Sequence, residues 1–318
     1  MSVDQRGPDG AAAAEAAEKG RRREDRLRAS MGSRQTGPDA SPPVSYDPEL
    51  ERLEIELLLE AVYRHYGFDF RSYAYASIRR RLWRRIEAEG LTTVSALQDR
   101  VLHEPSMMEQ LLLDLSINVT AMFRDPTFYL AFRQKVIPLL RTYPFFRIWH
   151  AGCSTGEEVY SMAILLEEEG LYDRARIYAT DINEVVVHRA RAGIFPLERM
   201  QEYTENYIRA GETRSFSEYY VAKYDGALFS PALQRNVVFS QHNLVTDRSF
   251  AEFNVILCRN VLIYFDRTLQ TRVHGLFYES LVHLGILCLG SKETLRLSDY
   301  EASYDELSGA DRIYRKVR

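Results

Sequence analysis

The sequence predicts an α/β fold, in which a doubly wound, mostly parallel sheet of the Rossmann type follows a small all-helical domain. From residue 145 to 318, short apolar runs alternate with segments of helical spacing, which is typical of a parallel sheet with helices on both faces. Between residues 49 and 115, apolar residues recur only with helical spacing. Residues 116–144 are predicted to be a linker and first helix that contribute to the functional site.

Composition and charge set the broad class of the protein. The chain has 318 residues, of which 46% are hydrophobic and 27% charged, and its net charge is −4. Such a charge implies no general attraction to nucleic acid or to anionic membranes. No apolar run approaches the roughly 20 residues that span a bilayer, and the N-terminus lacks a hydrophobic signal core. We therefore expect a cytoplasmic protein that does not insert into membranes.

Cysteine and histidine usage predicts neither disulfides nor a metal site. Cys153, Cys258 and Cys288 are odd in number and widely separated, so they fit neither a disulfide framework nor a zinc signature. The seven histidines show no ligand spacing. Reduced thiols are the simpler interpretation.

The N-terminal part is predicted to be a tail followed by four helices. Residues 1–48 hold almost no large apolar residues and cannot offset the entropy of ordering, so a disordered tail is expected. The first helix is indicated by the spacing of Leu53, Leu57, Leu58, Ala61 and Val62. Further helices fit residues 75–89, 94–102 and 105–115.

The C-terminal part is predicted to contain six strands. They lie at residues 146–151, 175–180, 236–240, 253–258, 285–290 and 312–317. The segment 211–233 interrupts the alternation of strands and helices. It is rich in Tyr and Phe and has a turn signal at Tyr224-Asp225-Gly226, which is compatible with a small inserted β-subdomain.

The turn after the first strand predicts a nucleotide-type ligand. The strand 146–151 leads through Gly152-Cys153-Ser154-Thr155-Gly156 into a helix. Such a turn lies at the carboxyl end of the first strand of an open sheet, where glycines let a ligand approach and a helix N-terminus offers free N–H groups. Asp181 ends the second strand and can accept hydrogen bonds from a ribose diol, or it can simply cap the next helix. These features favour an adenosine-bearing cofactor.

Charge at this turn favours S-adenosylmethionine over a dinucleotide. The glycine pattern G-x-G-x-x-G of dehydrogenases is absent. Glu157 and Glu158 open the helix instead, and acids there repel a pyrophosphate but suit a sulfonium ligand that has a free amino group. The alternative is that both acids only complement the helix dipole.

Four sequence blocks, in this order, carry a resemblance to a known family. They are Asn118–Asp125 (NVTAMFRD), Ser154–Ser161 (STGEEVYS), Ala179–Asn183 (ATDIN) with residues 190–195 (ARAGIF), and Ile256–Asp266 (ILCRNVLIYFD). From about residue 50 onward the chain resembles the CheR family of chemotaxis protein-glutamate O-methyltransferases, which depend on S-adenosylmethionine. It departs from the family pattern at Val159, where the family usually has Pro.

The resemblance implies a class I methyltransferase-like enzyme. Its reaction would transfer a methyl group from S-adenosylmethionine to glutamate side-chain carboxylates of a receptor or signalling protein, leaving S-adenosylhomocysteine. The alternative is a catalytically silent sensor or scaffold module that only binds the cofactor; the intact Arg259, Asn260 and Tyr264 argue against it. A nicotinamide oxidoreductase is disfavoured by the missing glycine pattern.

The family pattern also implies a role for individual residues. Arg124 and Tyr264 would be catalytic, because they would hold the substrate carboxylate. The cofactor would contact Asn118, Thr120, Arg124, Glu158, Asp181, Asn243, Leu244, Arg259 and Asn260. Taken alone, Asn118 and Thr120 are equally compatible with helix caps, and Arg124 with a local ion pair to Asp125.

A run of arginines on the second helix is the candidate substrate surface. The resemblance implies that Arg79, Arg80, Arg84 and Arg85 bind the acidic helical methylation region of a chemoreceptor or related protein. An anionic substrate helix would be attracted to such a patch. The alternative is a solvated face, with nucleic acid the least favoured partner.

The protein is expected to be a monomer.

Overall fold

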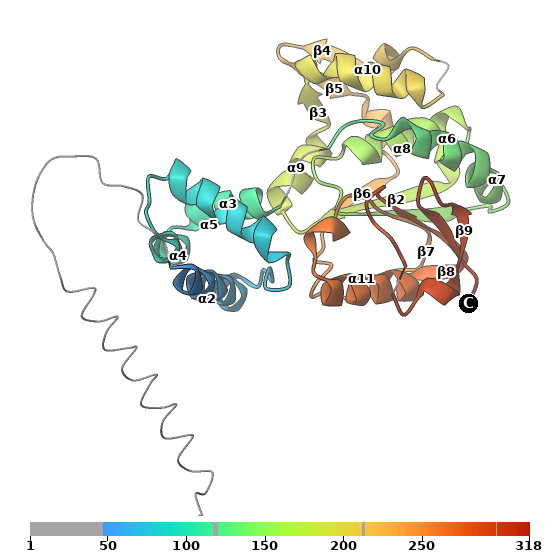
Figure 1. Cartoon of the computed structure of the whole chain (residues 1–318). Coiled ribbons are helices and arrows are strands. Elements are labelled where there is room, and N and C mark those ends of the chain that lie inside the picture. Colours follow the sequence, from blue (N-terminus) through green and yellow to red (C-terminus); the bar gives the residue numbers. More distant parts are fainter. Residues whose placement is uncertain (1–46, 117–119, 212–213, 297) are drawn as a thin grey trace, which may run out of the picture. The chain divides into compact units, whose positions relative to one another are not determined.

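The computed structural model describes residues 47–116, 120–211, 214–296 and 298–318. The predicted disordered tail, residues 1–48, lies almost entirely outside the described residues. Within them, the predicted fold class is confirmed: an all-helical part precedes a mostly parallel sheet, and a small antiparallel sheet is added to it (Figure 1).

Four helices pack around one apolar core in the helical domain. They are α2 (Pro48–Tyr66), α3 (Tyr75–Ala88), α4 (Val94–His103) and α5 (Pro105–Leu115). The buried face of α2 is formed by Ile55, Leu58 and Val62, whereas Leu53 and Leu57 are about half exposed. Local signals fix the helix starts: the Thr93 side chain accepts a hydrogen bond from the Ala96 amide at 3.0 Å at the start of α4.

The main sheet has seven strands in the order β6-β2-β1-β7-β8-β10-β9. Strands β6, β2, β1, β7 and β8 are parallel, and the hairpin β9–β10 pairs antiparallel with β8. Chain order reverses at β1, where the next strand of the sheet is β7 rather than a neighbour in sequence. The strands are β1 (Phe146–Ala151), β2 (Ala175–Asp181), β6 (Val237–Gln241), β7 (Phe253–Cys258), β8 (Leu281–Leu289), β9 (Tyr304–Ser308) and β10 (Ile313–Lys316).

The predicted strands are all present, with two corrections. β8 begins at Leu281, before the predicted start at residue 285. β9 was not predicted, because only Tyr304 and Ser308 of its residues are buried, so it lacks an apolar run.

Helices cover both faces of the sheet (Figure 1). One apolar core includes side chains of α6 (Pro126–Lys135), α7 (Ile137–Leu140), α8 (Glu157–Glu168), α9 (Glu184–Ala192) and α10 (Met200–Arg209). The other includes side chains of α11 (Arg267–Ser280). Consecutive residues of β1 alternate between the cores: Ile148 belongs to the first and Trp149 to the second. β1 is thus fixed at the centre of the domain.

The small antiparallel sheet has the order β3-β5-β4. Its strands are β3 (Ile194–Pro196), β4 (Tyr220–Lys223) and β5 (Gly226–Phe229). The predicted segment 211–233 contains β4 and β5 with their turn, but β3 lies before it. The β-subdomain therefore includes one more strand than predicted. β3 was missed because three residues are too few to show an alternation of apolar and polar side chains.

The described residues can also be compared with what membrane-spanning helices, disulfides and metal sites require. None of their helices is both long and apolar enough to cross a membrane. Cys153, Cys258 and Cys288 are free, buried thiols. Nowhere in the described ranges do three or more His, Cys, Asp or Glu side chains gather so that they could hold a metal ion.

Candidate active site

A pocket lies at the carboxyl ends of the parallel strands, next to the point where chain order reverses between β1 and β7. Tyr73, Leu115 and Ser116 of the helical domain also line it. The predicted cofactor and catalytic residues that the structure describes all line this pocket: Thr120, Arg124, Glu158, Asp181, Asn243, Leu244, Arg259, Asn260 and Tyr264. Asn118 lies outside the described residues.

The turn after β1 depends on left-handed backbone. Gly152, Ser154 and Gly156 have φ angles of 83°, 50° and 96°. A Cβ on Gly152 would lie 2.6 Å from a methyl group of Val261. Gly152 lines the pocket, where the glycines were expected to let a ligand approach, and its missing side chain also makes room for the loop that follows β7. This contact brings two walls of the pocket together.

Asp181 is held by backbone amides. Its carboxylate accepts hydrogen bonds from the amides of Ser154 at 2.9 Å and Asn183 at 3.0 Å. Asn183, not Asp181, caps α9, since the Asn183 side chain accepts from the Val185 amide at 2.9 Å. Burial raises the pKa of Asp181, and the backbone hydrogen bonds oppose that rise. Its oxygens keep lone pairs for a ligand in the pocket.

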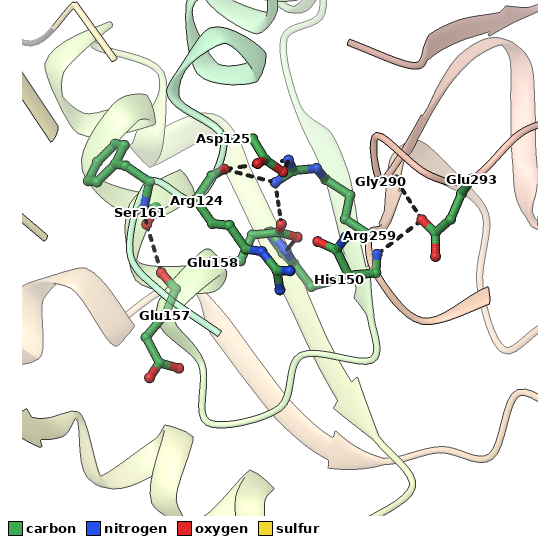
Figure 2. Close-up of polar contacts among 11 residues, drawn as sticks. Arg124, Asp125, His150, Glu157, Glu158, Ser161, Arg259, Gly290 and Glu293 are labelled. Atoms are coloured by element: carbon green, nitrogen blue, oxygen red, sulfur yellow. Dashed lines mark hydrogen bonds and ion pairs between the residues drawn. The ribbon is translucent and has the colours of Figure 1, made fainter. Parts of the chain in front are cut away.

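Arg259 is a buried cation shared by two acids. Its guanidinium binds Asp125 at 2.9 Å and Glu158 at 2.8 Å (Figure 2). It also lies 4.0 Å from the centre of the Phe128 ring. Burial alone would lower the pKa of Arg259, but the two acids raise it. Asp125 therefore pairs with Arg259, and the guanidinium fixes Glu158 at the pocket wall.

Glu158 receives a second donor from the opposite side. Nδ1 of His150 lies 3.1 Å from Oε1 of Glu158, while Arg259 binds Oε2 (Figure 2). Burial would raise the pKa of Glu158, but the charge of Arg259 and the hydrogen bond from His150 outweigh burial and lower that pKa. The carboxylate is therefore ionised at neutral pH. No histidine shows ligand spacing in the sequence, so this contact of His150 was not predicted.

Glu293 holds the loop that follows β7. Its carboxylate accepts four backbone hydrogen bonds, from Gly290 at 2.5 Å, Asn260 at 3.0 Å, Val261 at 2.8 Å and Leu262 at 2.7 Å. A Cβ on Gly290 would lie 2.7 Å from the Asn260 amide nitrogen, so this close approach requires glycine. Burial raises the pKa of Glu293, and the four amides oppose that rise. Nothing in the local sequence marks Glu293 as part of the site.

The interdomain linker presents Arg124 between two residues with left-handed backbone. Phe123 and Asp125 have φ angles of 51° and 58°, and the Phe123 amide donates to the Ser161 hydroxyl at 2.9 Å. Such conformations are costly for residues other than glycine and gather at functional sites. Asn260, with φ of 63°, adds another at this pocket. The backbone of the site is thus held in place by its surroundings.

Tyr264 connects the pocket to the helical domain. Its carbonyl accepts from the Ala74 amide at 2.9 Å, and the Arg81 guanidinium lies 4.9 Å from its ring centre. Burial raises the pKa of Tyr264, while Arg81 opposes the rise. The phenol therefore remains protonated and can donate a hydrogen bond. Arg81 was not predicted to act at the site.

The four arginines of α3 that were predicted to bind substrate differ in their exposure to solvent. Arg80 is exposed, and the Arg84 side chain is 79% exposed. Arg79 is half exposed and binds Glu51 at 2.9 Å. Arg85 was predicted to belong to the substrate surface, but its side chain is only 15% exposed and binds Asp114 and Glu89. Helical spacing turns Arg85 inward, so the exposed basic face is smaller than predicted.

The loop after β6 forms the remaining wall. Asn243 shapes this loop, since its side-chain oxygen accepts from the Val245 amide at 2.9 Å and its own amide donates to Asp247 at 2.8 Å. Leu244 is buried and offers an apolar surface to the pocket. His242, which was not predicted, also lines the pocket and packs edge-on against Trp149.

The chemistry of these groups fits one kind of cofactor. Glu158, an ionised acid, suits an ammonium group, Asp181 suits a ribose diol, and Leu244 suits an aromatic base. The fold and the site together define an S-adenosylmethionine-dependent methyltransferase.

Comparisons with known proteins identify the family. The family described as CheR methyltransferase, SAM binding domain, matches residues 118–308, and its all-alpha domain matches residues 53–116. The chain belongs to the CheR methyltransferase family, as its sequence resemblance implied.

Several relatives are similar along most of their length. The Cher3 protein of Pseudomonas putida is 53% identical over 264 residues, which cover 83% of this chain and 97% of the relative. Chemotaxis protein methyltransferase 2 of Pseudomonas aeruginosa is 31% identical over 77% of this chain and 92% of its own. The chemotaxis protein methyltransferase of Listeria innocua is 29% identical over 80% and 94%.

Proposed function

We propose that this methyltransferase acts in the cytoplasm on glutamate side chains of a chemoreceptor or related signalling protein. The observation that carries the proposal is the placement of Arg124 and Tyr264 in the same pocket as Glu158 and Asp181, the acids that suit the cofactor. A cationic and a phenolic donor are what an acceptor carboxylate needs. The names of the Listeria and Pseudomonas aeruginosa relatives support the same substrate class.

The residues of the pocket divide into two groups. Glu158 would hold the amino group of S-adenosylmethionine, Asp181 its ribose, and Asn243 with Leu244 the adenine. Thr120, Arg259 and Asn260 complete this side of the pocket. When bound, the cofactor supplies an electrophilic methyl group.

On the substrate side, the protein needs to orient rather than to deprotonate. A glutamate carboxylate is already ionised near neutral pH, so no general base is required. Arg124 and the protonated phenol of Tyr264 orient the carboxylate and strip water from it, and orientation of this kind can supply several kcal/mol of the barrier. Arg124 binds the oxygen that does not attack, because a strong ion pair on the attacking oxygen would weaken the nucleophile.

The proposal is tested by direct methyl transfer. The purified protein is incubated with labelled S-adenosylmethionine and the cytoplasmic helical segments of chemoreceptors from the same genome. Mass spectrometry should find methyl esters on glutamates, and segments with Gln at those positions should remain unlabelled. Binding of S-adenosylhomocysteine without labelling of any acidic segment would contradict the proposal and favour the silent binding module.

Asp181→Ala is expected to weaken S-adenosylhomocysteine binding by roughly 1–3 kcal/mol, because charge-assisted hydrogen bonds to the ribose are lost. Isothermal titration calorimetry measures the affinity, and circular dichroism shows whether the variant is folded. Unchanged affinity in a folded variant would remove Asp181 from the cofactor site.

Cofactor affinity should fall as the solution becomes acidic, and Asp181 should be the cause. Burial raises the pKa of Asp181 above its usual 3.8, whereas the pKa of Glu158 is lowered, with the charge of Arg259 as the main opposing cause. As pH falls, Asp181 therefore takes up its proton first and loses acceptor strength while Glu158 is still ionised. Calorimetry over the acidic range in which the protein stays folded should show this loss. An Asp181→Asn variant with the same pH dependence would refute the assignment.

The exposed arginines of α3 are expected to govern the KM for protein substrate. Reversing Arg80 and Arg84 to Glu should raise this KM about tenfold at low salt, because arginines attract an acidic substrate helix and glutamates repel it. The effect should shrink at high salt, where surface charges are screened. The matched control reverses Arg267 and Arg272, which are exposed on α11, and should leave the KM unchanged. Equal KM values for both double variants would leave α3 as an ordinary solvated face.

A further inference from the structure

We propose that His150 is a positioning residue for cofactor binding: it holds Glu158 in place through a neutral Nδ1–H donor. This inference rests on the proposed function only in assigning Glu158 to the cofactor's amino group. None of the four sequence blocks that carry the family resemblance includes His150, and its contact with Glu158 is visible only in the structure (Figure 2).

The ring of His150 is held rigidly. It lies on β1, pairs with Ala179 of β2 and Leu257 of β7, and is 1% exposed. Nδ1 lies 3.1 Å from Oε1 of Glu158. The position of this donor is therefore fixed by the centre of the sheet. A mobile side chain in the same place would lose more conformational entropy on making this hydrogen bond.

The environment of the second ring nitrogen defines the protonation state. Nε2 is buried and has no hydrogen-bond partner within the described part of the chain. A proton on Nε2 would be a buried donor without an acceptor, which is costly, whereas an unpaired lone pair is tolerated more easily. The geometry thus assigns the proton to Nδ1, where it is donated to Glu158, and leaves the ring uncharged.

A neutral donor suits the charge balance at this wall. Asp125 and Glu158 contribute two negative charges and Arg259 one positive charge. Within this ion-paired group one negative charge remains, and it matches the ammonium group of the ligand. A cationic side chain in place of His150 would cancel this charge. Because His150 holds Oε1 and Arg259 holds Oε2, the plane of the carboxylate is fixed from two sides while lone pairs remain for the ligand.

The test compares two substitutions at one position. His150→Phe keeps the ring but removes the donor, and His150→Asn places an amide N–H close to the position of Nδ1. Calorimetry with S-adenosylhomocysteine should show an affinity about tenfold below that of the wild type for His150→Phe. For His150→Asn the affinity should lie within about threefold of the wild-type value. The KM for protein substrate should be unchanged in both, and thermal melting shows whether each variant is folded.

Glu158→Gln separates this inference from the assignment beneath it. If Glu158→Gln weakens binding and His150→Phe does not, the inference about His150 is overturned and the role of Glu158 stands. If Glu158→Gln itself leaves the affinity unchanged, the assignment of Glu158 fails and the inference fails with it. Equal weakening in the Phe and Asn variants would show that ring packing, not the donor, is what matters.

Discussion

Arg259→Met is expected to destabilise the protein by about 3–5 kcal/mol and to abolish measurable cofactor binding. The Arg259 side chain is 2% exposed and is shared by Asp125 and Glu158. Removing one partner of a buried ion pair leaves an uncompensated charge, which accounts for a loss of this size. Here Glu158 would keep only the neutral donor of His150. Urea unfolding followed by circular dichroism measures the stability, and calorimetry measures the binding.

A matched control tests whether burial is the reason. Arg235 binds Asp173 across an exposed pair, with side chains 53% and 83% exposed, so Arg235→Met should change stability by less than about 0.5 kcal/mol. Arg259→Lys covers the case in which the Met variant does not fold. It keeps the charge but lacks the planar fork that reaches both acids, so it should fold and bind the cofactor weakly. Similar small losses for Arg259→Met and Arg235→Met would contradict the buried-pair argument.

The centre of the sheet could be predicted because its strands are buried on both faces. β1 and β7 are short apolar runs that lie next to segments with helical periodicity. Strands and helices that alternate in this way can form only a few sheet topologies. The edges could not be predicted in the same way. β9 buries only its end residues, and β3 has three residues, so pairing with a neighbour rather than local sequence defines both.

For the site, the sequence located positions but not partners. Glu158, Asp181 and Tyr264 follow strands whose carboxyl ends must meet, so their shared pocket could be anticipated. The groups that hold the site come from segments far apart in the chain. Asp125 reaches Arg259 from the linker, and Glu293 reaches the same loop from beyond β8. Such contacts depend on side-chain direction in the folded state, which one sequence does not reveal.

Glu293→Gln is expected to lower kcat by on the order of 100-fold. One amide group cannot accept the four backbone N–H bonds that the carboxylate accepts, because its NH₂ end is itself a donor and would face amide protons. Each buried donor left unpaired costs about 1–3 kcal/mol, and a 100-fold change in rate corresponds to about 2.7 kcal/mol. The loop that carries Asn260 and Tyr264 should relax to relieve this cost, which displaces both from the pocket.

Comparison of three variants separates this effect from a general loss of stability. Glu279→Gln makes the same chemical change at an exposed position on α11 and should leave kcat and the melting temperature unaltered. Glu293→Asp keeps the charge but is one methylene shorter, so it should retain an intermediate kcat. If Glu293→Gln is folded, binds S-adenosylhomocysteine like the wild type and turns over at the wild-type rate, Glu293 does not position the loop. If kcat is lowest in Glu293→Gln, intermediate in Glu293→Asp and highest in the wild type, while the melting temperatures do not follow that order, turnover depends on the geometry of this loop.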